Sequence, residues 1–514
     1  AGHAASRTQR SGVAPRRACG GAWIAAAACA AALMPAAAAD GSANFAEASW
    51  GPHPLCRKSP ELHTLRWPDG QSRLVAFGGK GFFWKLTKKG ERGQGKRSVR
   101  AAARAATRRS IQALARKGYI RRKSKMFGDT WAFKPVASTW SHISYEDART
   151  PVARWKPSTT VTAGKQVMVL FGGCRTTAAS GVMNDLWLFR TQEGHPREGL
   201  WTQVFTVNPP PKRRGHVTTT NKTHLVIIGG KGWDPAQGSH VLNDVWAIPL
   251  DTLGISVPHP SAPAARAGGE AAGATPLDAS LSWKGGAPAA AARLPLPRWT
   301  RGASFPGAPR WGATGTMVKG LDGRDWLAFF GGRRKNAGAK FHSTDKKAYT
   351  YYNQLWLYDF EANAWTLTQP RGDRPEPRDH HGAAGVDGVL YVFGGRVKEA
   401  RTADAVINDL WSFSLAQGVW KLHTASGPAP RPRYMPGVAA TKHQGRSAVA
   451  VFGGESLPGS TKTTSMNDLW VFPTEGSAAA GWVSLYGDEC LPDVVPLPPG
   501  RRGEEALAER PAQL

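Results

Sequence analysis

One pattern recurs along nearly the whole chain: a short apolar strand that ends in two glycines. Its six copies are LVAFGG (74–79), VMVLFGG (167–173), LVIIGG (225–230), WLAFFGG (326–332), LYVFGG (390–395) and VAVFGG (449–454). A strand that is apolar on both faces belongs in the middle of a sheet, and paired glycines permit positive φ angles where it ends. Six copies in a fixed order predict a repeat architecture in which each copy is one supersecondary unit.

Two further strand signals and a corner follow each copy. The second strand carries a tryptophan, in GDTWAF, NDLWLF, NDVWAI, NQLWLY, NDLWSF and NDLWVF. The third strand carries another, at Trp140, Trp201, Trp299, Trp365, Trp420 and Trp482. We expect these twelve of the 21 tryptophans to fill the core between neighbouring sheets. A Pro/Arg-rich corner, such as PPPKRRGHV or RPRYMPG, then leads into the next unit.

This order of apolar-Gly-Gly, Asn-Asp-x-Trp, Trp and Pro-Arg resembles the kelch repeat, and the resemblance covers residues 50–488. It implies an all-β fold, a six-bladed kelch-type β-propeller of four-stranded antiparallel blades, related to the central domain of galactose oxidase. The first unit is the most degenerate, so seven blades is the alternative. The six blades are expected at about 57–144, 153–205, 213–303, 309–369, 377–424 and 431–486.

Two insertions and a tail interrupt this pattern. The insertion in blade 1, residues 80–126, is expected to be basic and helical, with 17 Lys/Arg and one acid between Lys80 and Lys125. It supplies a large part of the formal net charge of +30. The insertion in blade 3, residues 251–296, and the tail, residues 489–514, are rich in Ala, Pro and Gly or in charge and are expected to be disordered.

The basic insertion is a candidate binding arm for a polyanion. Its segment SVRAAARAATRRSIQALARKGYIRRKSK (98–125) contains no acidic residue. The candidate residues are Arg100, Arg104, Arg108, Arg109, Arg116, Arg121 and Arg122, of which the first three form an i, i+4 stripe on a helix. The alternative is a solvated, partly disordered insertion with no partner.

Strand order places this arm on one face of the propeller. If the strands of a blade run a to d from the channel outward, the b–c and d–a loops share a face. The same face receives the basic b–c loop of blade 4, with Arg333, Arg334 and Lys335, and the corner arginines Arg57, Arg154, Arg214, Arg310, Arg378 and Arg433. Two roles stay open for the corner arginines: contact with a ligand, or hydrogen bonds to carbonyls around the channel.

The favoured function is a non-enzymatic binding scaffold for an acidic protein partner, and an anionic glycan is also considered. The resemblance implies that this face binds partner peptides. We expect no nucleic-acid partner, because the basic residues are not interleaved with exposed aromatics and no nucleic-acid motif is found. No catalytic residue, metal site or cofactor is predicted. The alternative is a galactose-oxidase-like or other propeller enzyme with its site at the channel mouth, although that family's motifs are not recognisable.

The N-terminal 39 residues are expected to be a secretory signal peptide. A positive Arg16-Arg17 precedes an Ala-rich apolar run with Ala-x-Ala cleavage options near Ala37–Ala39. A secreted or secretory-pathway location follows, with a membrane anchor or a transit peptide to an organelle lumen as alternatives. No membrane span is expected in the mature chain, and the oligomeric state is left undecided.

Three more residues are candidates for covalent modification. Cys56 opens the repeat region and Cys490 closes it, so a disulfide between them is attractive in an oxidising compartment, and unpaired thiols are the alternative. Asn221-Lys222-Thr223 is a glycosylation sequon expected in an a–b turn, on the face opposite the basic arm.

Overall fold

The computed structural model of this chain describes residues 54–87, 98, 113, 116–118, 120–143, 150–176, 178–191, 199–236, 238–255, 296–320, 323–339, 348–398, 405–424, 427–456, 464–474, 481–487 and 494–495. The expected signal peptide lies outside this part. Gly51–Leu514 forms one compact unit. The elements with described bounds are strands and two short 3-10 helices, η2 (Ala179–Gly181) and η3 (Asp251–Leu253), so the fold is all-β.

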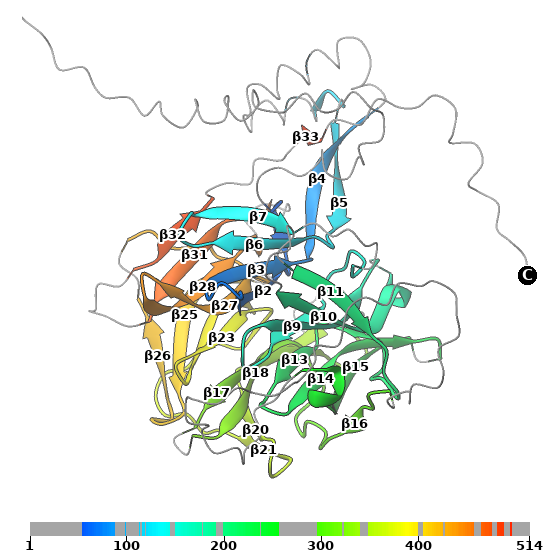
Figure 1. Ribbon diagram of the computed structural model, residues 1–514, viewed down its shortest axis with the longest axis vertical. Helices are drawn as coiled ribbons and strands as arrows, with labels where there is room; N and C mark the ends of the chain where they lie inside the picture. Colours follow the sequence, from blue (N-terminus) through cyan, green and yellow to red (C-terminus); the bar gives the residue numbers. More distant parts are fainter. Residues whose placement is uncertain are drawn as a thin grey trace, which may run out of the picture. The chain divides into compact units, whose positions relative to one another are not determined.

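Six antiparallel sheets follow the six repeats, and we number them sheet 1 to sheet 6 in chain order (Figure 1). Their first strands are β2 (Glu61–Arg66), β8 (Ser158–Val161), β13 (Val217–Thr220), β17 (Trp311–Lys319), β23 (Gly382–Val386) and β27 (Gly437–His443). Their second strands are β3 (Ser72–Phe77), β9 (Val167–Cys174), β14 (His224–Asp234), β18 (Asp325–Lys335), β24 (Val389–Val397) and β28 (Arg446–Phe452). Their third strands are β6 (Thr130–Lys134), β10 (Val182–Thr191), β15 (Gly238–Pro249), β20 (Leu355–Asp359), β25 (Ala405–Ser414) and β31 (Leu469–Pro473). Their fourth strands are β7 (Thr139–Ile143), β11 (Gly199–Val204), β16 (Thr300–Arg301), β21 (Ala364–Leu367), β26 (Val419–His423) and β32 (Val483–Tyr486).

The first strands of successive sheets contact one another, and β2 of sheet 1 contacts β27 of sheet 6. Sheets 1, 2 and 6 are four-stranded, and sheets 3, 4 and 5 have a short fifth strand; this arrangement of antiparallel sheets is consistent with a β-propeller. Backbone hydrogen bonds also join the first repeat to the last. The amide of Ser59 donates to the carbonyl of Met435 (2.8 Å), and the amide of Arg57 donates to the carbonyl of Met466 (2.9 Å).

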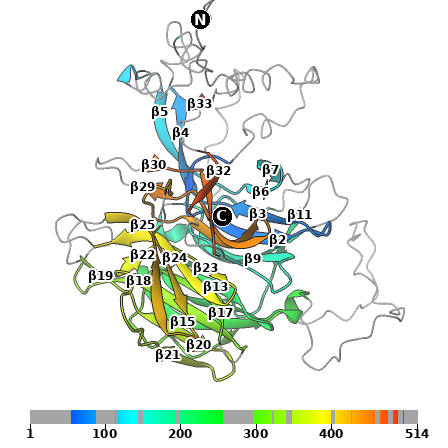
Figure 2. The ribbon, with the colours of Figure 1, turned by 90° about the vertical axis from the view of Figure 1, so that its left-hand side faces the viewer.

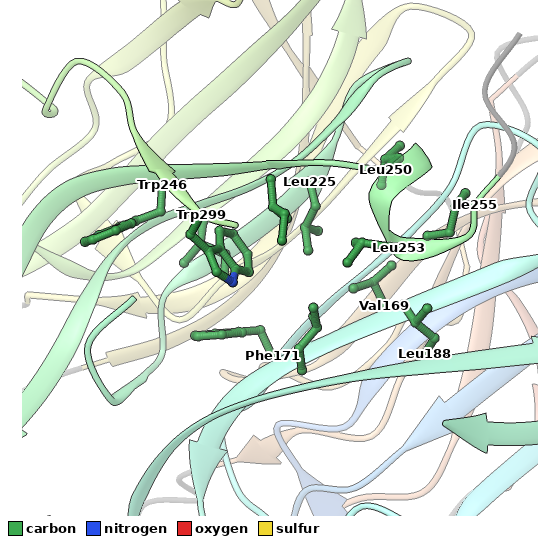
Figure 3. Packing of buried hydrophobic residues seen from close by; sticks show 12 residues of the cluster. Val169, Phe171, Leu188, Leu225, Trp246, Leu250, Leu253, Ile255 and Trp299 are labelled. Carbon is green, nitrogen blue, oxygen red and sulfur yellow. The ribbon is translucent and has the colours of Figure 1, made fainter. Parts of the chain in front are cut away.

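The expected core tryptophans lie between the sheets. Nine of the twelve are buried: Trp131, Trp140, Trp187, Trp201, Trp246, Trp299, Trp420, Trp470 and Trp482. The other three, Trp356, Trp365 and Trp411, pack against the buried clusters of sheets 4 and 5. Figure 3 shows Trp246, Trp299 and Phe171 gathered with aliphatic side chains between sheets 2 and 3.

The described ends of the basic insertion form strands, which corrects the expected helix for its last part, from Ile120 onward. β4 (Lys80–Leu86) pairs with β5 (Ile120–Met126) as an antiparallel hairpin, and Figure 2 shows this hairpin extending from the sheets. The seven-residue register runs from Lys80↔Met126 to Leu86↔Ile120 and pairs the backbone groups that the two strands turn toward each other. Between the strands, Ser98, Ala113 and Arg116 have helical backbone.

Two regions expected to be disordered contain ordered residues. In the tail, β33 (Val494–Val495) pairs in parallel with β4. In the blade 3 insertion, Asp251–Leu253 forms η3, and Leu253 and Ile255 are buried against Val169 and Leu188 (Figure 3). Burial of these two apolar side chains keeps the first residues of that insertion in the core.

Candidate functional site

Five corner arginines form buried ion pairs with the aspartate of the Asn-Asp-x-Trp or Gly-Asp-x-Trp motif. The pairs are Arg57–Asp129, Arg154–Asp185, Arg213–Asp244, Arg378–Asp409 and Arg433–Asp468. Each guanidinium donates two hydrogen bonds of 2.6–2.9 Å to its carboxylate, which is the bidentate geometry that arginine favours. The same aspartate accepts a hydrogen bond from the tryptophan two residues later.

These arginines are therefore part of the framework, which agrees with the second of the two roles left open for them, hydrogen bonding to backbone carbonyls. Arg57, Arg154, Arg378 and Arg433 are fully buried, and each also donates to the carbonyl of the first glycine of its Gly-Gly pair. Burial alone would raise the pKa of Asp129, but the charge and hydrogen bonds of Arg57 outweigh it and hold that pKa below its usual value.

Two of the six predicted corner arginines depart from this arrangement. In sheet 3 the buried ion pair is made by Arg213 rather than the predicted Arg214, because adjacent residues of an extended chain point in opposite directions. In sheet 4, Gln354 stands where the other sheets have aspartate. Arg310 donates one hydrogen bond to Gln354 Oε1 (3.0 Å), and burial lowers the pKa of Arg310 to about 10.

The residue after each buried arginine pairs across the strands with the residue after each Gly-Gly. We call these twelve residues the mouth ring. Its six pairs are Lys58–Lys80, Trp155–Cys174, Arg214–Lys231, Trp311–Arg333, Asp379–Arg396 and Tyr434–Glu455. The ring contains six cationic and two acidic side chains, so its charge is strongly positive.

Only some of the six cations of the mouth ring form ion pairs with its two acidic side chains. Asp379 lies 2.9 Å from Arg396 and 2.9 Å from Arg333. Burial would raise the pKa of Asp379, but its cationic neighbours outweigh burial and hold the pKa well below its usual range. Glu455 forms an ion pair with Lys58 and a hydrogen bond with the hydroxyl of Tyr434.

The other side of the mouth ring carries cations around an aromatic ring. Arg214, which is only 8% exposed, has no carboxylate partner in the described part of the chain and donates to Cys174 Sγ (3.4 Å). Burial and the nearby positive charges lower the pKa of Lys231 to about 8. Lys80, Lys58 and Arg214 all lie within 6 Å of the centre of the Trp155 ring, at 5.1, 5.9 and 5.8 Å, a distance at which cations and aromatic faces attract.

A bridge of two side chains crosses between opposite sheets beside the mouth ring. Lys156 of sheet 2 approaches His380 of sheet 5, with 2.5 Å between Lys156 Nζ and His380 Nε2. Both residues have positive φ angles, +51° and +53°, a backbone conformation that costs free energy in residues other than glycine. Each occupies the second position after a buried corner arginine, Arg154 or Arg378.

A channel is lined by residues of all six first strands. Its narrow part has a volume of about 200 Å³ and contains Glu61, His63, Thr159 and His381. Glu61 accepts hydrogen bonds from the amide and hydroxyl of Thr159 (3.1 and 2.8 Å). Burial raises the pKa of Glu61 to about 7 and lowers those of His63 and His381 to about 4 and about 3. A wider cavity of about 690 Å³, rich in threonine, continues along the channel.

The residues predicted for the two basic loops are dispersed. Arg333 belongs to the mouth ring, Arg334 is exposed, and Lys335 donates to the carbonyl of Ala339 (2.7 Å). Arg116 is exposed. Arg121 and Arg122 lie on β5, whereas Arg100, Arg104, Arg108 and Arg109 lie outside the described residues.

The structure describes Cys56 and Asn221 but not Cys490 among the residues predicted to be modified. Cys56 is disulfide-bonded, but its partner lies outside the described residues, as does Cys490, so the Cys56–Cys490 pairing stays a prediction. Asn221 lies in the turn between β13 and β14, and its side-chain oxygen accepts from the amides of Thr223 (2.8 Å) and His224 (2.6 Å). Glycosylation of Asn221 also stays a prediction.

A family model, the KLHDC2/KLHL20/DRC7 Kelch-repeats domain, matches residues 105–281 and 305–491. The chain belongs to the kelch-repeat family. Membership of this family suggests a protein-interaction scaffold role. Among the described residues, no helix has the length and apolar character needed to cross a membrane.

Similarity to individual kelch proteins is partial. Kelch domain-containing protein 3 of Homo sapiens is 34% identical over 129 residues, which cover 25% of this chain and 30% of that protein. Kelch repeat-containing protein 2 of Saccharomyces cerevisiae is 31% identical over 123 residues, covering 23% of this chain and 13% of that protein. The chain thus spans less than a third of the length of these relatives.

Of the twelve residues of the mouth ring, only Arg214 and Arg333 were predicted from the sequence, although a positional signal for the others was present. Each member follows either a corner arginine or a Gly-Gly pair directly. The prediction of a binding site relied mainly on the continuous basic segment of the insertion. The mouth ring instead takes two residues from each of six repeats. Aligning the six repeats and comparing these two columns would have shown six cations against two acids.

Proposed function

We propose that this kelch-repeat protein is a non-enzymatic scaffold that holds an acidic segment of a protein partner at the mouth ring. The observation that carries the proposal is the excess of cations in the ring, with Arg214 buried and without a carboxylate partner in the described part of the chain. An uncompensated buried guanidinium is costly, so a carboxylate from outside the chain would lower its free energy.

The geometry of the mouth ring suits a peptide side chain rather than a flat surface. Arg214 and Lys231 are 8% and 7% exposed, so an anionic group must project inward to reach them. The partly exposed Lys58 and Lys80 lie nearer the solvent and can attract the partner during encounter through long-range electrostatics. The basic insertion is proposed to extend this attraction, because it leaves the sheets from Lys80 of the ring itself.

Two features of architecture and location complete the proposal. Sheets 1 to 6 are the six blades of a closed propeller, a view supported by the contact of β2 with β27. The protein acts in the secretory pathway or outside the cell, or in an organelle lumen. The disulfide at Cys56 supports an oxidising compartment.

The test measures binding of a fluorescent Glu-rich decapeptide to the full chain, with a heparin tetrasaccharide as the competing anionic glycan. We expect the peptide to bind more tightly than the tetrasaccharide, and binding to weaken as salt rises. Deletion of residues 88–118 should weaken binding while leaving the β4–β5 hairpin strands in place. Tighter binding of the tetrasaccharide, or no salt-dependent binding of the peptide, would contradict the proposal.

A further inference from the structure

Lys156, His380 and Asp379 form a chain of three side chains beside the mouth ring. Lys156 Nζ lies 2.5 Å from His380 Nε2, and His380 Nδ1 lies 2.6 Å from Asp379 Oδ2. The Asp379 carboxylate only accepts hydrogen bonds, so Nδ1 of His380 carries its proton. Nε2 therefore presents a lone pair to the amine of Lys156.

The groups facing Lys156 favour the neutral amine. Burial is the largest effect lowering the pKa of Lys156 well below the value of an ordinary lysine, and the charges of Arg214, Arg333 and Arg396 act in the same direction. Asp379 opposes them, and so does the Trp155 ring, whose centre lies 4.9 Å from Lys156 Nζ. Asp379 already accepts from His380 and Arg396. A desolvated lysine beside other cations is a recognised way to obtain a nucleophilic amine.

The local chain provides space for this arrangement. A Cβ atom on Gly312 would come within 2.9 Å of the His380 ring, so glycine at 312 lets the imidazole lie where it meets Lys156. At the position that Lys156 occupies in sheet 2, the other sheets carry Ser59, Gly215, Gly312, His380 and Met435. Sheet 2 alone supplies an amine there.

We propose that Lys156 is a covalent attachment site that forms a reversible imine with aldehydes or ketones bearing an anionic group. The amine nitrogen bonds to the carbonyl carbon, its two protons pass in turn by way of His380 Nε2 to the former carbonyl oxygen, and that oxygen leaves as water as the C=N bond forms. Asp379 stabilises the imidazolium that forms for part of this cycle. Arg214 lies close enough to influence the charge of Lys156 and would attract the anionic group of the carbonyl compound.

The test uses 4-carboxybenzaldehyde and cyanoborohydride on the full chain, followed by peptide mapping. We expect Lys156 to be labelled at least tenfold faster than Lys165, an exposed lysine of the same molecule. Neutral benzaldehyde should label Lys156 at least fivefold more slowly than the carboxylated probe. The rate at Lys156 should rise less steeply between pH 7 and 9 than the rate at Lys165, because its pKa lies below that of an ordinary lysine.

A substitution of His380 tests the role of its imidazole in imine formation. His380→Gln should slow the labelling of Lys156 at least fivefold, with thermal unfolding measured as a check of the fold. Labelling of Lys156 no faster than Lys165 in the unmodified chain would overturn the proposal without any variant. The labelling test contains no peptide or protein partner. Its failure can therefore be distinguished from failure of the acidic peptide to bind.

Discussion

Asp244 accepts two hydrogen bonds from Arg213, each of 2.7 Å, while Trp246 Nε1 donates to the same carboxylate at 2.6 Å. This Arg–Asp–Trp unit joins the corner of sheet 3 to its third strand and recurs in sheets 1, 2, 5 and 6. Removing one partner of a buried pair leaves an uncompensated charge, so the unit is expected to be a main determinant of stability.

Asp244→Asn should lower the free energy of unfolding by about 3–5 kcal/mol, because Arg213 stays buried without its counter-charge. Urea denaturation measures the change. The matched control is Asp325→Asn, which breaks the pair with Lys319, whose side chain is 58% exposed. The control should cost less than about 1 kcal/mol, and equal effects of the two substitutions would refute the structural role of the unit.

Gln354→Asp should stabilise the protein by about 1–3 kcal/mol, because it completes the unit in sheet 4 with charged hydrogen bonds. Arg310 now makes a single bond to Gln354, and the buried Trp356 Nε1 has no hydrogen-bond partner in the described part of the chain. Thermal unfolding measures the effect. Gln354→Asn serves as the uncharged control and should give no gain. A lower midpoint for Gln354→Asp would show that the stacking of Arg310 on Tyr352, 3.7 Å from guanidinium carbon to ring centre, has replaced the ion pair.

Glu61→Gln should become more stable relative to the parent as pH rises. The folded protein holds the pKa of Glu61 at about 7, above its usual value of 4.5, so the parent loses stability as pH rises from 4.5 to 7. The glutamine oxygen can keep both hydrogen bonds from Thr159. Urea denaturation at pH 4, 6 and 8 should show a difference that grows by roughly 1–3 kcal/mol over this range, and a constant difference would contradict the burial of an uncompensated carboxylate.

Lys231→Gln should weaken binding of the Glu-rich decapeptide about fivefold and reduce its dependence on salt. The pKa of Lys231 is about 8, so the parent should lose affinity as pH rises through 8 and the variant should not. Fluorescence anisotropy measures both. Lys222→Gln, an exposed lysine in the β13–β14 turn, is the control and should leave affinity unchanged; an equal loss would argue for nonspecific attraction.

Non-reducing peptide mapping should find Cys56 joined to Cys490, with Cys174 as a thiol. Cys174 is buried and free, and Cys56 is disulfide-bonded. The pairing of Val494 with Trp84 brings the chain just after Cys490 to the strand that also pairs with Arg57. Recovery of Cys56 as a free thiol, or joined to another cysteine, would refute this pairing.

The strands and the core were predictable because their signals are local. LVIIGG lies within β14 and NDVWAI within β15, and burial of their apolar side chains needs no knowledge of distant partners. The basic insertion was harder. Its sequence from Ile120 to Met126 pairs with Lys80–Leu86, and this non-local pairing prevailed over the helical pattern.

The repeat of the sequence by itself determined the kelch family, the order of strands and the positions of the core tryptophans. Only the tertiary structure decided which charges are structural and which face the mouth. Arg213 and Arg214 are adjacent and chemically identical, yet one is paired with Asp244 and the other is not. Lys156 and His380 are 224 residues apart and meet only because the sheets surround a channel. The physical reason is that burial and the distance between charges set the behaviour of an ionisable group, and both arise only when the sheets are assembled.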